Sequence, residues 1–109
     1  INVFNECHYC VPAHTAIAKN MGADDSITKN IKAGKALDDD KLEALRQFTL
    51  VMLKKRGNAS ESELESFYEA GYGQRQALEV ILGIAQKTMS NFTNHIAQTP
   101  IDEPFKKFA

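Results

Sequence analysis

The chain is organised around one stretch near its start, Asn5-Glu6-Cys7-His8-Tyr9-Cys10-Val11-Pro12-Ala13-His14, which holds both cysteines and two of the three histidines. Cys7, Cys10 and His14 stand at i, i+3 and i+7, so on a helix the three reactive groups share one face. A Cys-x-x-Cys pair is close enough to close as a disulfide, and a neutral imidazole can accept a thiol proton. The stretch therefore predicts a redox dithiol with its own base, in which His14 lies within reach of the Cys10 sulfur.

Pro12 limits where the first helix can begin. Proline lacks an N–H, so it is tolerated only in the first turn of a helix. The helix should start no earlier than about His8 and run to Met21, with Gly22 as its stop. Both cysteines then lie at or within the first turn, where free N–H groups and the positive end of the helix dipole stabilise a thiolate and lower a cysteine pKa.

Composition is that of an ordinary soluble domain. The 109 residues are 43% apolar and 25% charged, with a net charge of −1 and no basic surface for a nucleic acid or a membrane. No apolar run approaches the roughly 18 residues of a membrane span, and no signal peptide is visible. Two close cysteines in an otherwise cysteine-free chain favour an intracellular redox or metal site, so the expected location is cytoplasmic.

The rest of the chain has apolar residues at helical spacing, and no segment alternates with a period of two. Capping and stop residues divide this pattern into four further helices: one from Asp24-Asp25-Ser26 to Gly34, one from Asp38-Asp39-Asp40 to Lys54-Lys55-Arg56, one from the capping box Ser60-Glu61-Ser62-Glu63 to Gly71, and one from Gln74 to Ala97. The expected fold is all-α, with about five to six helices in one domain over residues 1–109.

The last helix is the most apolar. Its middle, from Ala77 to Ala85, is apolar nearly all round, as expected of a central buried helix. After it, Phe105 and Phe108 are expected to dock on the body or on a neighbouring molecule. This is more apolar surface than a monomer of this size covers easily, which predicts an obligate homo-oligomer with the last helix in the interface.

Several segments together resemble a known family. The stretch from Glu6 to Ala16 is similar to the Cys-x-x-Cys-x-x-x-His signature of the alkylhydroperoxidase D-like branch of the carboxymuconolactone decarboxylase family. The likeness covers nearly the whole chain, through Met21-Gly22, Leu37-Asp38, Ala70-Gly71-Tyr72, Gln76-Ala77-Leu78-Glu79-Val80, Asn91-Phe92-Thr93-Asn94-His95-Ile96-Ala97 and Pro100-Ile101-Asp102.

The resemblance implies an all-helical fold that forms trimers or hexamers and uses thiols to reduce peroxides or the disulfide of a partner peroxiredoxin. Carried over to this sequence, Cys7 and Cys10 are the redox pair and His14 is the relay histidine, with no cofactor. The family's decarboxylase branch lacks such a cysteine pair, which argues against that activity here. The resemblance also implies a thiol reductant as a partner.

One family residue has no counterpart in this sequence. The relay glutamate of the family lies well before the first cysteine, a position upstream of Ile1, and Glu6 does not occupy it. Ile1-Asn2-Val3-Phe4 looks like the last turn of something earlier, so we expect that an N-terminal segment is missing. The alternative is that the relay is incomplete.

Two alternatives to the redox interpretation remain. Cys7, Cys10 and His14 could bind zinc with His8 or His95 as the fourth ligand, although the usual second, distant ligand pair is missing. The cysteines could also be two small buried apolar side chains in a non-catalytic helical module.

The remaining polar candidates are two histidines and two asparagines. His8 lies between the cysteines and either aids proton transfer or faces solvent. His95 is expected to be a structural hydrogen-bonding residue. Asn91 and Asn94 are polar on an otherwise apolar helix, so we expect them to satisfy buried backbone groups or to line a subunit interface, with a catalytic role as the less favoured alternative.

Overall fold

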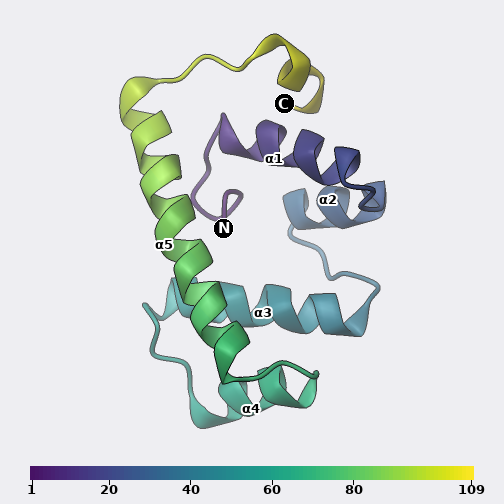
Figure 1. Ribbon diagram of the computed structural model, residues 1–109, viewed down its shortest axis with the longest axis vertical. Helices are drawn as coiled ribbons and strands as arrows, with labels where there is room; N and C mark the ends of the chain where they lie inside the picture. The colour runs from purple at the N-terminus through teal and green to yellow at the C-terminus, as the bar shows by residue number, and fades with distance from the viewer. The chain divides into compact units, whose positions relative to one another are not determined.

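The computed structural model describes residues 1–109 and contains only helices, turns and loops (Figure 1). The elements, in chain order, are α1 (Cys10–Asn20), α2 (Asp25–Lys32), α3 (Asp40–Lys54), α4 (Glu61–Glu69), α5 (Gln74–Ala97) and a 3-10 helix, η1 (Glu103–Phe108). The predicted all-α fold of five to six helices is confirmed. None of these helices combines the length and the apolar character needed to span a membrane.

Two units can be distinguished within the chain. The first, called here the aromatic unit, comprises Ile1 and Leu37–Gln86 and holds α3, α4 and the first half of α5. The second, called here the dithiol unit, comprises Asn2–Ala36 and Lys87–Ala109 and holds α1, α2, the second half of α5 and η1. All the candidate site residues predicted from the sequence belong to the dithiol unit.

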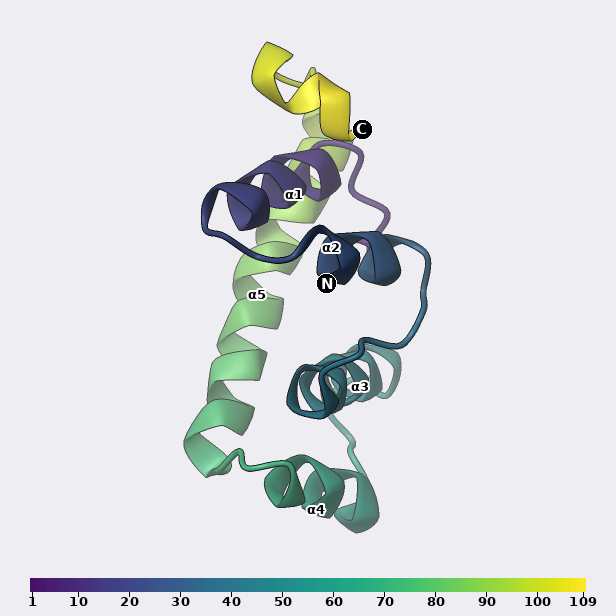
Figure 2. The ribbon, with the colours of Figure 1, turned by 90° about the vertical axis from the view of Figure 1, so that its right-hand side faces the viewer.

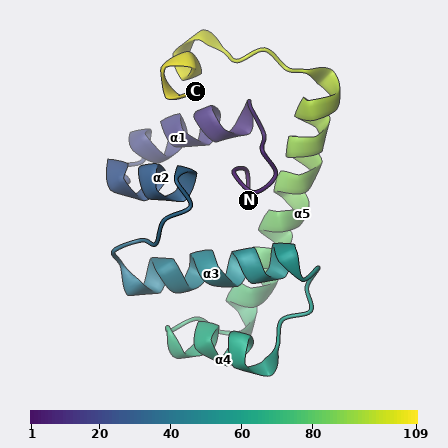
Figure 3. The same cartoon turned by 180° about the vertical axis from the view of Figure 1, so that it is seen from behind.

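The aromatic unit is built on a stack of three rings. The centroids of Phe48 and Phe67 are 4.1 Å apart, and those of Phe67 and Tyr72 are 4.6 Å apart, with nearly parallel planes in both pairs. Phe48, Met52 and Phe67 are buried, and α3 and α4, which carry them, lie side by side (Figures 1 and 3). Such ring pairs add to the stabilisation that comes from the burial of apolar area.

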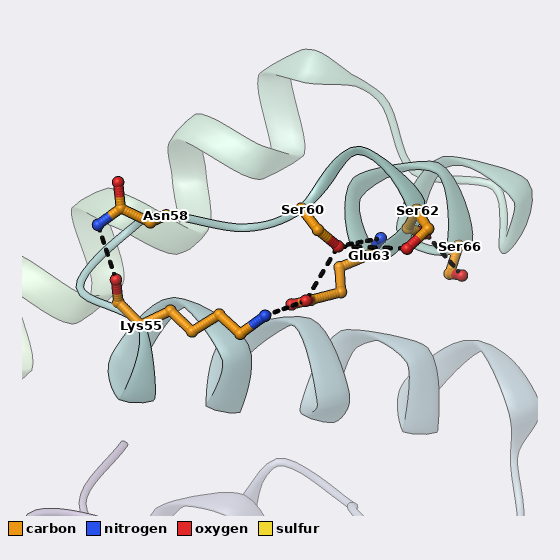
Figure 4. A network of polar contacts seen from close by, with 6 residues as sticks. All are labelled: Lys55, Asn58, Ser60, Ser62, Glu63 and Ser66. Atoms are coloured by element: carbon orange, nitrogen blue, oxygen red, sulfur yellow. Dashed lines mark hydrogen bonds and ion pairs between the residues drawn. The ribbon is translucent and has the colours of Figure 1, made fainter.

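Side-chain caps fix the helix starts of this unit. Asp39 accepts a hydrogen bond from the Leu42 N–H at 2.8 Å, and Ser60 Oγ accepts one from the Glu63 N–H at 3.2 Å. The Glu63 carboxylate pairs with Lys55 and also accepts the Ser60 hydroxyl, and these bonds lower the pKa of Glu63 (Figure 4). The capping predicted at Ser60 is therefore confirmed.

In the dithiol unit, α1 packs against α2 and η1 (Figure 2). The Tyr9 hydroxyl donates to the Asp102 carboxylate, and the Tyr9 ring meets Phe105 edge to face, with centroids 6.3 Å apart. Lys32 Nζ donates to the carbonyl of Phe108 at 2.6 Å. Of the two docking alternatives predicted for the C-terminal phenylalanines, the structure shows docking on the chain's own body.

The prediction of a buried central helix is wrong for the single chain. In α5 the side chains of Leu78 and Leu82 are 67% and 69% exposed, and Asn91 is the one buried residue. Hydrophobic periodicity identifies residues that share a face, but it does not tell which of two apolar faces meets the core. The face that packs on the aromatic stack carries Ala77, Val80 and Ile84.

Candidate active site

The dithiol lies at the start of α1, which begins two residues later than expected. Tyr9 is the N-cap residue, Cys10 is the first helical residue, and Pro12 lies in the first turn as predicted. The Val11 N–H donates to the Cys7 carbonyl at 3.1 Å, an i to i−4 bond that carries helical hydrogen bonding back to the first cysteine. Cys7 thus precedes the helix, while Cys10 lies within it.

A tight turn delivers Cys7 to this position. Cys7 N–H donates to the Asn2 carbonyl and Glu6 N–H to the Val3 carbonyl, both at 3.0 Å, which is the hydrogen-bond pattern of a helix C-terminus. Glu6 has a φ of 54°, a left-handed conformation that costs a non-glycine residue about 1–2 kcal/mol. His95 Nε2 donates to the Glu6 carbonyl at 3.2 Å and helps to hold the turn, so the expected structural role of His95 is confirmed.

Asn91 holds the same turn from α5. Its side chain is fully buried, its Nδ2 donates to Asn2 Oδ1 at 2.9 Å, and its Oδ1 accepts from Asn5 Nδ2 at 3.0 Å. Both ends of the Asn91 amide are therefore satisfied by side chains, and not by backbone groups, the first of the roles that we expected for Asn91. A buried polar group satisfied at both ends fixes one conformation of the segment that it contacts.

The two sulfurs are buried thiols, with Cys7 0% and Cys10 2% exposed, and no disulfide joins them. They have different hydrogen-bond partners. Cys7 Sγ accepts the backbone N–H of Cys10 at 3.2 Å. Cys10 Sγ accepts Asn94 Nδ2 at 3.2 Å and lies 3.6 Å from Ser90 Oγ.

This difference separates the acidities of the two thiols. Burial raises the pKa of Cys7, and its hydrogen bond with the Cys10 side chain raises it further. Burial also opposes ionisation of Cys10, but hydrogen bonds from Cys7, Ser90, Asn91 and Asn94 outweigh it and lower the Cys10 pKa. The expectation of a lowered cysteine pKa therefore holds for Cys10 and is wrong for Cys7.

His14 does not contact the sulfur for which it was predicted to act as base. Its Nε2 lies 2.9 Å from Lys87 Nζ, and no hydrogen bond joins it to Cys10. An ammonium group can only donate, so His14 Nε2 is the acceptor and the proton of the neutral ring is on Nδ1. Burial and the Lys87 charge lower the pKa of His14, which favours the neutral imidazole, the form that can accept a proton.

His8 also makes no hydrogen bond with either sulfur. Its Nε2 donates to the Thr99 carbonyl at 2.9 Å, and its ring stacks on His95 with centroids 6.5 Å apart. No three His, Cys, Asp or Glu side chains gather where they could hold a metal ion. The ligand set of the zinc alternative is therefore not brought together.

One face of α5 supplies the polar side chains around the dithiol. Lys87, Ser90, Asn91 and Asn94 stand at i, i+3, i+4 and i+7, so they share a helix face. Lys87 and Ser90 were not predicted from the sequence to lie near the dithiol. The signal was present, because these residues form a polar stripe on a helix whose other face is apolar.

Two comparisons of the sequence with known proteins find no match. A scan against protein-family models finds no matching family, and a search of curated proteins finds no match. The resemblance to the alkylhydroperoxidase D-like branch stays a prediction from the sequence, so the function is argued from the geometry of the two sulfurs.

Proposed function

We propose that the protein is a dithiol oxidoreductase of the alkylhydroperoxidase D-like type, in which Cys7 and Cys10 reduce a peroxide and become a disulfide. The unequal environment of the two sulfurs carries this proposal. Cys10 accepts a hydrogen bond from Asn94 and has a lowered pKa, whereas burial raises the pKa of Cys7. A low-pKa thiol beside a second thiol is the arrangement of a nucleophile and its resolving partner.

The reaction then has two steps. The Cys10 thiolate attacks one oxygen of the peroxide, so an S–O bond forms while the O–O bond breaks, leaving Cys10 as a sulfenic acid and releasing an alcohol after proton uptake. The Cys7 sulfur attacks the Cys10 sulfur, an S–S bond forms, and the hydroxyl group leaves with the Cys7 proton as water. A thiol reductant, one of the partners implied by the resemblance, then returns two electrons to the Cys7–Cys10 disulfide by disulfide exchange. Where the partner is a peroxiredoxin, the dithiol gives its two electrons to the peroxiredoxin disulfide instead of to a peroxide, and the same reductant restores it.

His14 is the proton acceptor in this scheme. It lies one helical turn after Cys10, and the neighbouring Lys87 favours its neutral form. Its action requires the ring to turn from Lys87 towards Cys10. Replacing His14 by Ala should raise the apparent pKa of the reactive thiol without unfolding the chain, and an unchanged pH profile would remove His14 from the mechanism.

We further propose that the protein is a cytoplasmic homo-oligomer, a trimer or a hexamer. The second half of α5 exposes Met89, Phe92 and Ile96 by 71%, 56% and 88%, at the spacing of one helix face. A second copy of the chain is the occupant that the family resemblance implies for this face. Sedimentation at micromolar concentration tests it, and a single 12.1 kDa species would overturn the assembly.

The test of the activity is mass spectrometry after treatment with a stoichiometric amount of organic hydroperoxide under non-reducing conditions. The chain should lose two hydrogens. A Cys7→Ser variant should accumulate a sulfenic acid on Cys10 that dimedone traps, while a Cys10→Ser variant should remain unoxidised at Cys7. Free thiols at both positions after treatment, or equal reactivity of the two single variants, would overturn the proposal.

A further inference from the structure

The end of α5 returns the chain over the residue that contacts the Cys10 sulfur. Gln98 has a φ of 48°, and the Thr99 N–H donates to the Asn94 carbonyl at 3.3 Å. A left-handed residue followed by this six-to-one bond is the Schellman ending of a helix. It places the Thr99 side chain against the side chain of Asn94.

The Thr99 hydroxyl fixes the orientation of the Asn94 amide. Thr99 Oγ1 donates to Asn94 Oδ1 at 2.6 Å, which occupies the oxygen end of the amide. The nitrogen end keeps its two hydrogens, and one of them points at Cys10 Sγ across 3.2 Å. Because a thiolate can only accept hydrogen bonds, this orientation suits the ionised sulfur and would be lost if the amide turned over.

Thr99 is itself held from the motif between the cysteines. His8 Nε2 donates to the Thr99 carbonyl at 2.9 Å. The hydrogen bonds therefore run from His8 to Thr99, from Thr99 to Asn94 and from Asn94 to Cys10. This series of hydrogen bonds joins residues near both ends of the chain, since His8 and Thr99 are 91 positions apart in sequence.

We propose that Asn94 is a catalytic residue that donates to the Cys10 thiolate, and that Thr99 is a positioning residue that holds the Asn94 amide in the donating orientation. This proposal deepens the proposed dithiol activity and rests on it for its biological meaning, since it assigns how the attacking sulfur is kept ionised. His8 acts in it as a support for Thr99 and has no part in carrying protons.

The experiment titrates the Cys10 thiolate by its ultraviolet absorbance in a Cys7→Ser background, where Cys10 is the one thiol. This readout needs no reagent to reach a buried sulfur. Asn94→Asp keeps the shape of the side chain but replaces the donor by an oxygen. Thr99→Val keeps the shape of Thr99 without the hydroxyl, and Thr99→Ser restores the hydroxyl. Thr93→Val is the matched control, because the Thr93 hydroxyl is exposed and donates only to the Met89 carbonyl.

We expect Asn94→Asp to lower the thiolate fraction at neutral pH about tenfold, because a donor is exchanged for a negative charge. Thr99→Val should lower it about threefold, because the lost bond is one step removed from the sulfur. Thr99→Ser and Thr93→Val should match the parent. Superimposed titration curves for Asn94→Asp and the parent would overturn the role of Asn94, and a Thr99→Val curve equal to that of Thr93→Val would overturn the role of Thr99.

The same set of variants distinguishes a loss of folding from a loss of the proposed roles. Far-ultraviolet circular dichroism checks that each variant keeps its helices, and Thr99→Val, which removes one hydroxyl after the end of α5, carries the test if Asn94→Asp unfolds. If the titrations shift as expected but hydroperoxide leaves both thiols of the wild-type chain free, the positioning pair stands and the peroxidase activity fails. If hydroperoxide oxidises the wild-type chain but no titration shifts, the activity stands and the pair fails.

Discussion

The aromatic unit and the dithiol unit differ in what they bury. The first buries Phe48, Met52 and Phe67, whose apolar side chains make no hydrogen bonds. The second buries the two cysteines and Asn91, and each of these side chains is hydrogen-bonded. The Cys7 sulfur accepts the Cys10 N–H, the Cys10 sulfur accepts the Asn94 amide, and Asn91 donates to Asn2. Apolar burial stabilises a fold without directing chemistry, whereas buried polar groups are costly unless each is satisfied.

One charged contact from each unit illustrates the same contrast. In the aromatic unit Glu43 accepts two hydrogen bonds from the Arg46 guanidinium and others from Gln47 and the Leu37 N–H, which lower its pKa from 4.5 to about 2. In the dithiol unit, Lys87 contacts a histidine instead of a carboxylate. The ion pair of Glu43 stabilises the charged form of both partners, whereas the Lys87 charge favours the neutral form of His14, the form that the proposed function requires.

The largest expected effect is on the aromatic core. Phe67 is 1% exposed and stacks on both Phe48 and Tyr72, so Phe67→Ala should lower the free energy of unfolding by about 3–5 kcal/mol. Urea denaturation followed by far-ultraviolet circular dichroism measures it, with Phe67→Leu as a smaller truncation if the alanine variant does not fold. A loss below about 1 kcal/mol would mean that the ring stack is not the core of this unit.

The next effect concerns the polar burial. Asn91→Leu leaves Asn2 and Asn5 without their shared partner, so we expect a loss of about 1–3 kcal/mol in the free energy of unfolding. The amide of Cys7, which closes the turn onto Asn2, should also exchange its hydrogen faster. Thr93→Val is the control from the same helix. Equal stability and unchanged exchange in Asn91→Leu would show that the buried amide does not hold the dithiol turn.

Helix positions and caps could be predicted from the sequence because they depend on neighbouring residues. Asp24, Asp39 and Ser60 each cap the helix expected after them, and Pro12 lies in the first turn of α1. These signals act over three or four positions, and the burial of the rest of the chain does not override them.

The partners of the site residues could not be predicted in the same way. The sequence does not show that Cys10 and Ser90 lie close together, because 80 positions separate them. Spacing alone also could not tell which cysteine receives the side-chain donors, nor that the His14 ring meets Lys87. These contacts depend on how α1 packs against the second half of α5, which periodicity does not specify.

A smaller effect is expected at Ser60, the N-cap of α4. Ser60 Oγ accepts the Glu63 N–H, so Ser60→Ala should cost about 1 kcal/mol. Ser66→Ala in the same helix is the control, because the Ser66 hydroxyl donates to a carbonyl inside the helix and alanine has the better helix propensity (Figure 4). Denaturation midpoints measure both, and equal losses in the two variants would contradict the assignment of Ser60 as the cap.

This cap should also depend on pH. The pKa of Glu63 is lowered in the folded chain, so its contribution to stability is present at neutral pH and is lost as the pH falls through the lowered value. Because the Ser60 hydroxyl is one of the groups that stabilise the Glu63 carboxylate, the difference between wild type and Ser60→Ala should narrow in acid. A difference that stays constant would remove Ser60 from the stabilisation of this carboxylate.

The smallest expected effect involves one charge in the dithiol unit. Burial is the main reason for the lowered pKa of His14 and the Lys87 ammonium is the next, so Lys87→Gln should raise this pKa part of the way towards its usual value. The unfolded chain takes up the His14 proton before the folded chain does, so stability falls as the pH drops below about 6.5. This loss of stability at low pH should be smaller in Lys87→Gln.

Imidazole resonances followed by NMR across the pH range give the His14 titration directly. Lys29→Gln, which changes an exposed lysine of the same unit, is the matched control. If His14 titrates at the same pH in both variants, Lys87 is an ordinary surface charge. If only Lys87→Gln shifts the titration, less of the imidazole is neutral near its pKa, and thiol oxidation should slow in that range while it stays unchanged at higher pH.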